Sequence, residues 1–69
     1  MLTRWERLKA VQRMQEHIEA HLTEPVTLAA LAKAARYSPW YAARLFKEHT
    51  GSSPFEYLRK RRLSAAAVE

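Results

Sequence analysis

The 69-residue chain has no cysteine, so neither a disulfide framework nor a thiolate metal site can stabilise it. Secreted proteins of this size usually need such staples, and an intracellular helical domain is therefore the expected class. The chain also has no long apolar run, because charged residues recur throughout; this excludes a membrane-spanning helix. The first four residues lack the apolar segment of a secretory signal. We expect at most one domain, residues 1–69, with a modest core.

Positive charge is concentrated in the second half of the chain. Residues 1–35 carry five Lys or Arg against four Glu, a net charge of +1, whereas residues 36–69 carry seven against three, a net charge of +4. A basic half of this kind indicates a polyanionic partner, either a nucleic acid or an anionic surface. The charge distribution leaves both partners open.

Helix signals occur in the first half of the chain. Thr3 and Glu6 have the spacing of a capping box, and apolar residues then keep helical spacing, which predicts a helix over about 4–22 that ends before Pro25. Thr27 can cap a short second helix. Its apolar residues are Leu28, Leu31, Ala32 and Ala35.

Two further helices are predicted in the second half. Ser38 followed by Pro39 is typical of a helix start, and the single glycine of the chain, Gly51, is a natural C-cap for a helix ending near residue 50. The segment from Ser53 to Glu56 repeats the start signal, which predicts a fourth helix over about 54–68. No strand signal appears, so the expected fold is an all-α, homeodomain-like bundle of three to four helices.

The connection between the second and third helices is very short, roughly residues 36–37. Two short helices joined this closely must cross steeply, as in a helix-turn-helix, here over about 28–50. The pattern of apolar residues supports this geometry, with a small residue where the helices cross. The residues expected to face inward are Leu31, Ala32, Ala35, Tyr37, Ala42, Leu45 and Phe46.

The opposite side of the third helix carries a stripe at spacing i, i+3, i+4 and i+7: Trp40, Ala43, Arg44 and Lys47. A recognition helix places such residues against base edges. The guanidinium of Arg44 suits guanine O6 and N7, Trp40 offers apolar area to a thymine methyl or a sugar, and Ala43 permits close approach. Lys47 and the helix-capping Ser38 are expected to contact phosphates.

Each of these assignments has an ordinary alternative. Trp40 could be a core or interface aromatic. Arg44 could be solvated, or could pair with Glu48 at spacing i+4. The basic run Arg59–Arg62 could be a solvated helix face; alternatively Arg59 and Arg62 contact phosphates, although the run cannot face one groove as a whole because its members point in different directions.

Two motifs at fixed spacing carry a resemblance to a known family. They are Tyr37-Ser38-Pro39-Trp40-Tyr41-Ala42-Ala43-Arg44-Leu45-Phe46-Lys47 and Thr50-Gly51-Ser52-Ser53-Pro54-Phe55-Glu56-Tyr57-Leu58-Arg59. The chain resembles the AraC/XylS family of bacterial transcription regulators over roughly residues 14–66. The lead-in from Pro25 to Ala32 is also similar to that family.

The resemblance implies a specific organisation. It makes residues 38–49 the first of two recognition helices of the family's DNA-binding domain, and residues 54–68 the helix that links the two units. The second unit is absent, so we expect a fragment that binds DNA with micromolar or weaker affinity. Any effector domain is expected on the C-terminal side, because Met1 lies so close to the first helix.

Two positions depart from the family pattern. Arg36 stands in the turn where the family usually has glycine, and a side chain in a left-handed turn costs about 1 kcal/mol. Ala42 stands where the family usually has an inward leucine, a loss of buried volume unless neighbours fill the space. Arg36 could in return add a phosphate contact.

Residues suited to catalysis are scarce. His17 and His21 share a helix face, but their order is not that of a zinc-protease motif and no third ligand is evident, so solvated histidines are the better interpretation. There is neither a phosphate-binding glycine loop nor a nucleophile–base set. We therefore expect no enzyme, no cofactor and no metal.

Two other binding functions compete with DNA recognition. An interaction or oligomerisation module with only non-specific DNA affinity could use Trp5, Leu8 and the 65–68 tail as an apolar patch. Membrane-surface binding through the basic fourth helix ranks lower, because that helix has a weak apolar face. The leading prediction is a cytoplasmic, nucleoid-associated module whose partners are double-stranded DNA and RNA polymerase.

Overall fold

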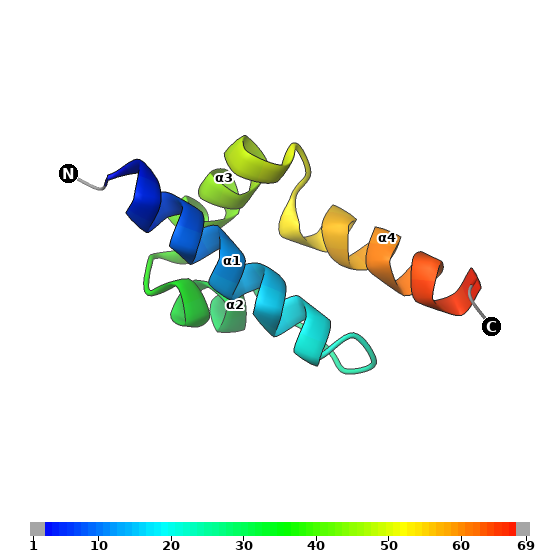
Figure 1. Ribbon diagram of the computed structural model, residues 1–69. Helices are drawn as coiled ribbons and strands as arrows, with labels where there is room; N and C mark the ends of the chain where they lie inside the picture. The colour runs from blue at the N-terminus through cyan, green and yellow to red at the C-terminus, as the bar shows by residue number, and fades with distance from the viewer. Residues whose placement is uncertain (1–2, 68–69) are drawn as a thin grey trace.

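Four helices make up the part of the chain, residues 3–67, that the computed structural model describes: α1 (Arg4–Ala20), α2 (Leu28–Ala35), α3 (Pro39–Thr50) and α4 (Pro54–Ala67) (Figure 1). No strand occurs among these residues, and the all-α prediction is confirmed. None of the four helices combines the length and the apolar character that a membrane crossing demands.

Hydroxyl side chains cap all four helices, as the sequence predicts. Each accepts a hydrogen bond from the backbone N–H three residues later, in the pairs Thr3–Glu6, Thr27–Ala30, Ser38–Tyr41 and Ser53–Glu56. α1 ends at Ala20, two residues before the predicted limit, because the His21 N–H bonds to the Ile18 carbonyl at 3.1 Å and the chain turns there. The predicted end of the fourth helix, residue 68, lies outside the described residues.

The turn between α2 and α3 is a left-handed C-cap. The Tyr37 N–H donates to the Ala32 carbonyl at 3.1 Å and the Arg36 N–H donates to the Lys33 carbonyl at 3.2 Å, the bonding pattern of a Schellman motif. Arg36 has φ 66°, the one positive value at a non-glycine residue between residues 3 and 67. The predicted left-handed conformation of Arg36 is confirmed.

Arg36→Gly should stabilise the chain by about 1 kcal/mol, because glycine adopts the left-handed conformation without the steric cost of a Cβ. Urea unfolding followed by circular dichroism measures this change. Lys33→Gly is the control: Lys33 is also exposed but lies inside α2, so glycine there should destabilise by about 1 kcal/mol. A loss of stability in Arg36→Gly would contradict the strain.

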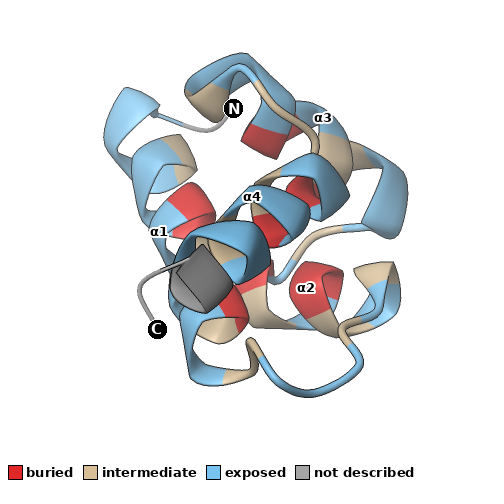
Figure 2. Ribbon diagram, turned by 90° about the vertical axis from the view of Figure 1, so that its right-hand side faces the viewer, coloured by how far each residue is buried: buried red, intermediate tan, exposed pale blue. Residues whose placement is uncertain are grey.

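One core unites the four helices (Figure 2). Its buried residues are Ala10, Val11, Met14, Ile18, Leu31, Ala32, Ala35, Ala42, Leu45, Phe46 and Leu58. α1, α2 and α3 pack on one another, and the predicted inward faces of α2 and α3 are confirmed. Tyr37, half-buried, packs at the edge of the core next to Tyr41, with ring centroids 5.3 Å apart.

α4 extends away from the other three helices, which gives the molecule a long dimension of 44 Å against 20 and 16 Å (Figure 1). Its first turns are anchored by the buried residues Pro54 and Leu58. The Tyr57 ring meets the Phe46 ring edge-on, with centroids 5.4 Å apart, and so joins α4 to α3. The N-terminal part of α4 therefore belongs to the core of the bundle.

Candidate nucleic-acid interface

The outer face of α3 carries the predicted stripe. Trp40 is 69% exposed, Arg44 and Lys47 are exposed, and Ala43 is half-buried between them. The alternative that places Trp40 in the core is therefore wrong. Because the opposite face of α3 is buried against α1 and α2, the helix is held rigidly while this stripe faces solvent.

The guanidinium of Arg44 lies between two neighbours on α3. Its Cζ is 5.4 Å from the centroid of the Trp40 ring, a cation–π distance. Its Nε donates to Glu48 Oε1 at 3.1 Å. The pairing with Glu48, one of the alternatives raised by the spacing, is thus present in the free chain. Neither Nη group of Arg44 takes part in the bond to Glu48.

Two more candidates lie at the N-terminal end of the stripe. Ser38 is exposed, and its oxygen accepts from the Tyr41 N–H at 3.3 Å, which leaves its hydroxyl proton available to an anion. Arg36 is exposed in the preceding turn. Arg36 thus precedes the N-terminus of α3 by only a few residues in the chain, and a helix N-terminus is suited to a phosphate.

At the other end of the stripe, Lys47 lies one turn beyond Arg44 and close to the start of α4. Ser53 donates from its side chain and its backbone to the Glu56 carboxylate, and these bonds lower the pKa of Glu56; the charges of Lys47 and Lys60 act in the same direction. The charges of Lys47 at the end of α3 and of Lys60 on α4 thus both act on Glu56 at the start of α4.

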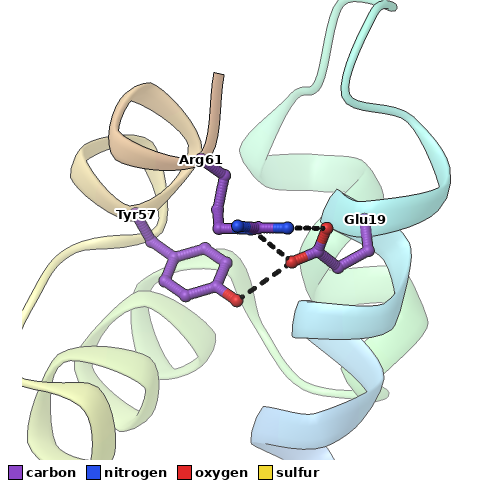
Figure 3. Close-up of polar contacts among 3 residues, drawn as sticks. All are labelled: Glu19, Tyr57 and Arg61. Carbon is purple, nitrogen blue, oxygen red and sulfur yellow. Dashed lines mark hydrogen bonds and ion pairs between the residues drawn. The ribbon is translucent and has the colours of Figure 1, made fainter. Parts of the chain in front are cut away.

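The four basic residues of α4, Arg59–Arg62, differ in the groups that they contact. Arg61 clamps Glu19 of α1 with two hydrogen bonds, from Nε at 2.6 Å and from Nη2 at 3.0 Å, and the Tyr57 hydroxyl adds a third at 3.3 Å (Figure 3). Lys60 Nζ lies 3.3 Å from the Ser52 hydroxyl. Arg59 is exposed. The expectation that the four side chains diverge is confirmed.

Arg62 reaches the segment that follows α1. Its Nε donates to the Leu22 carbonyl at 2.8 Å and its Nη2 to the Glu24 carbonyl at 2.7 Å. Leu22 and Glu24 lie between α1 and α2, so these bonds fasten α4 to the segment that connects those two helices. A phosphate contact by Arg62 would have to use its remaining N–H groups or break these bonds. Sequence reasoning missed this docking role, because backbone carbonyls give no signal in the sequence.

The contact between α1 and α4 shifts three pKa values, and the hydrogen bonds and charge of Glu19 raise that of Arg61. The hydrogen bonds and charge of Arg61 hold the pKa of Glu19 below its ordinary value, and the bond from Tyr57 adds to this effect. Burial raises the pKa of the Tyr57 phenol, and the negative charge of Glu19 raises it further. Glu19 is therefore ionised in the folded chain at neutral pH and below.

A fall in pH should weaken the contact between Glu19 of α1 and Arg61 of α4. Since the folded-state pKa of Glu19 is depressed, its stabilising effect is present above the unfolded pKa, near 4.5, and is lost as the pH falls through the lower folded value. Thermal melts of wild type and Glu19→Gln should thus differ at pH 7 and converge at acidic pH. Glu16→Gln, at an exposed position on the same helix, should follow the wild type throughout. Equal melting temperatures for Glu19→Gln and wild type at pH 7 would disprove the effect.

Two histidines and the described part of the expected apolar patch belong to α1 and its C-cap. The rings of His17 and His21 are 4.4 Å apart, and His21 Nδ1 is 3.3 Å from Glu24 Oε2. Residues 3–67 contain no group of three or more potential metal ligands. Trp5 is 65% exposed with Lys9 Nζ 5.5 Å above its ring, and Leu8 is 39% exposed. The side chains of 65–68, the other part of the expected apolar patch, lie outside the described residues.

Comparison with known proteins gives several matches. Residues 31–69 match the model of a family described as a helix-turn-helix domain. The regulatory protein SoxS of Salmonella typhimurium is 41% identical over 59 residues, covering 86% of this chain and 55% of SoxS. The right origin-binding protein of Escherichia coli is 45% identical over 51 residues, covering 74% of this chain and 18% of that protein. No solved structure gives a significant match.

These matches coincide with the geometry described above. The matched family region contains the whole of α3 and α4, including the exposed stripe. The chain spans about half the length of the SoxS proteins, which are themselves regulators of this family. The fold of the matched domain is homeodomain-like, as predicted. The chain therefore belongs to the AraC/XylS family of transcription regulators and contains its DNA-binding helix-turn-helix module.

Proposed function

We propose that α3 enters the major groove of double-stranded DNA and reads base edges with Trp40, Ala43 and Arg44. The observation that carries this proposal is the exposed stripe on a helix whose other face is locked in the core. Arg44 is placed to recognise guanine, and Trp40 to contact a thymine methyl or sugar. Because α3 belongs to the rigid bundle, the stripe meets the groove without rearrangement of the fold.

The phosphate contacts of this interface flank the stripe. Arg36 and Ser38 serve the N-terminal end of α3, and Lys47 the C-terminal end. On α4, Arg59 and the remaining N–H groups of Arg62 extend the basic surface. These contacts set register and give salt-dependent affinity, whereas base contacts give specificity.

In the organisation we propose, residues 1–69 form a single module with α4 as its linker helix. The module itself acts by binding and not by catalysis, without a cofactor or metal. It operates in the cytoplasm on the bacterial nucleoid, with RNA polymerase as the further partner of the regulator. The similarity to SoxS, itself named a regulatory protein, supports this organisation.

Selection from a pool of random DNA duplexes tests base reading by the 69-residue chain. We expect enrichment of a short motif that contains a guanine, with micromolar affinity at physiological salt. Salt-dependent binding without enrichment would reject base reading and leave a phosphate-binding module. That result would favour the second candidate, an interaction module, for which the exposed ring of Trp5 is the specific observation.

A further inference from the structure

Glu48 is the single acidic residue of α3, and its carboxylate contacts the residue proposed to read guanine. Its Oε1 accepts from the Arg44 Nε at 3.1 Å, and its side chain is 54% exposed beside the stripe. A carboxylate at this place requires an explanation, because it lies on the face of α3 that is proposed to approach a polyanion.

Helix stability does not account for Glu48. A negative charge near the C-terminal end of a helix opposes the helix dipole. The order of the pair, with the cation four residues before the anion, is also the weaker of the two orders. Exposed pairs of this kind contribute little to folding in any case. The charge of Glu48 is thus opposed by the helix dipole in the free chain and by the phosphates when DNA is near.

The geometry of the pair suits a role in holding Arg44. The Trp40 ring lies on one side of the guanidinium and Glu48 on the other, so the side chain is fixed along the stripe. Glu48 occupies only the Nε–H of Arg44, while an arginine has five N–H donors. The two Nη groups remain available for paired acceptors such as guanine O6 and N7.

We propose that Glu48 is a specificity-determining residue that positions Arg44, an inference that rests on the proposed reading of DNA by α3. On a duplex with the matching guanine, the Nη groups of Arg44 bind the base while Nε stays with Glu48. On other sequences the bond to Glu48 holds Arg44 along the stripe and away from the phosphates, so Arg44 adds no compensating contact. Glu48 therefore lowers non-specific affinity more than specific affinity.

The test is a ratio of two dissociation constants: that for the selected duplex with its Arg44-dependent base pair exchanged, divided by that for the selected duplex itself. Glu48→Gln should strengthen binding to the exchanged duplex about two- to five-fold, the scale of an exposed charge pair, and so lower the ratio. Glu16→Gln, which removes the same charge from an exposed site on α1, should leave the ratio unchanged. Glu48→Ala should behave as Glu48→Gln does.

The Arg44→Ala background separates this inference from the proposed function. Because Glu48 acts through Arg44, adding Glu48→Gln to Arg44→Ala should not change the ratio further. If Arg44→Ala lowers the ratio but Glu48→Gln and Glu48→Ala keep the wild-type value, the role of Glu48 is rejected and base reading by α3 stands. If Arg44→Ala itself leaves the ratio intact, base reading by Arg44 fails, and the inference fails with it.

Discussion

Arg44→Ala is expected to weaken binding to the selected duplex about 5- to 150-fold, the equivalent of the roughly 1–3 kcal/mol that a bidentate arginine–guanine contact contributes. The loss should be confined to one base pair of the site. Arg44 is exposed and its neighbours Trp40 and Glu48 remain in place, so the fold of the variant should be unaffected. Titration of fluorescent duplexes, matched and exchanged at each position, measures both effects.

Arg13→Ala is the matched control for this experiment. Arg13 is an exposed arginine on α1, so its removal changes the net charge equally. This control should retain every base preference of the wild type, even where overall affinity falls. A uniform decrease in Arg44→Ala across all duplexes would show that Arg44 contacts phosphate and not a base.

Phe46→Ala is expected to unfold most of the chain. Phe46 is completely buried, and its ring meets Tyr57 of α4 edge-on. Removal of a buried phenylalanine costs about 3–5 kcal/mol, which is comparable to the whole stability of a domain this small. Circular dichroism at 222 nm during urea titration measures the change in the free energy of unfolding.

Phe46→Leu separates the loss of volume from the loss of the aromatic contact. This milder variant should remain folded at 25 °C, because most of the buried apolar volume is retained. It should still lose part of the contact between α3 and α4 that depends on Tyr57. A cooperative, wild-type unfolding curve for Phe46→Ala would show that α3 does not depend on this residue for its place in the bundle.

Much of this fold could be predicted from the sequence because its determinants are local. A capping hydroxyl acts on an N–H three residues away, and the left-handed turn at Arg36 is bonded to residues of the preceding helical turn. The pairing of Arg44 with Glu48 also lies within one helix. Such features follow from spacing alone, and so did the exposed stripe opposite the buried face of α3.

The docking of α4 could not be predicted in the same way. Glu19 and Arg61 are separated by 42 residues, and nothing in their spacing pairs them. Arg62 bonds to backbone carbonyls, which every residue has, so the identities of Leu22 and Glu24 give no signal. The sequence therefore did not distinguish the partners of the four basic residues 59–62, although these partners differ in the structure.

The two left-handed residues that flank α3 have a consequence for the thermodynamics of binding. Arg36, with φ 66°, and Gly51, with φ 80°, fix the chain direction at both ends of the helix. The rotation of α3 about its own axis is thereby set before DNA is met, and little backbone entropy remains to be lost on association. In the proposed complex, adaptation to the groove falls to exposed side chains such as that of Lys47.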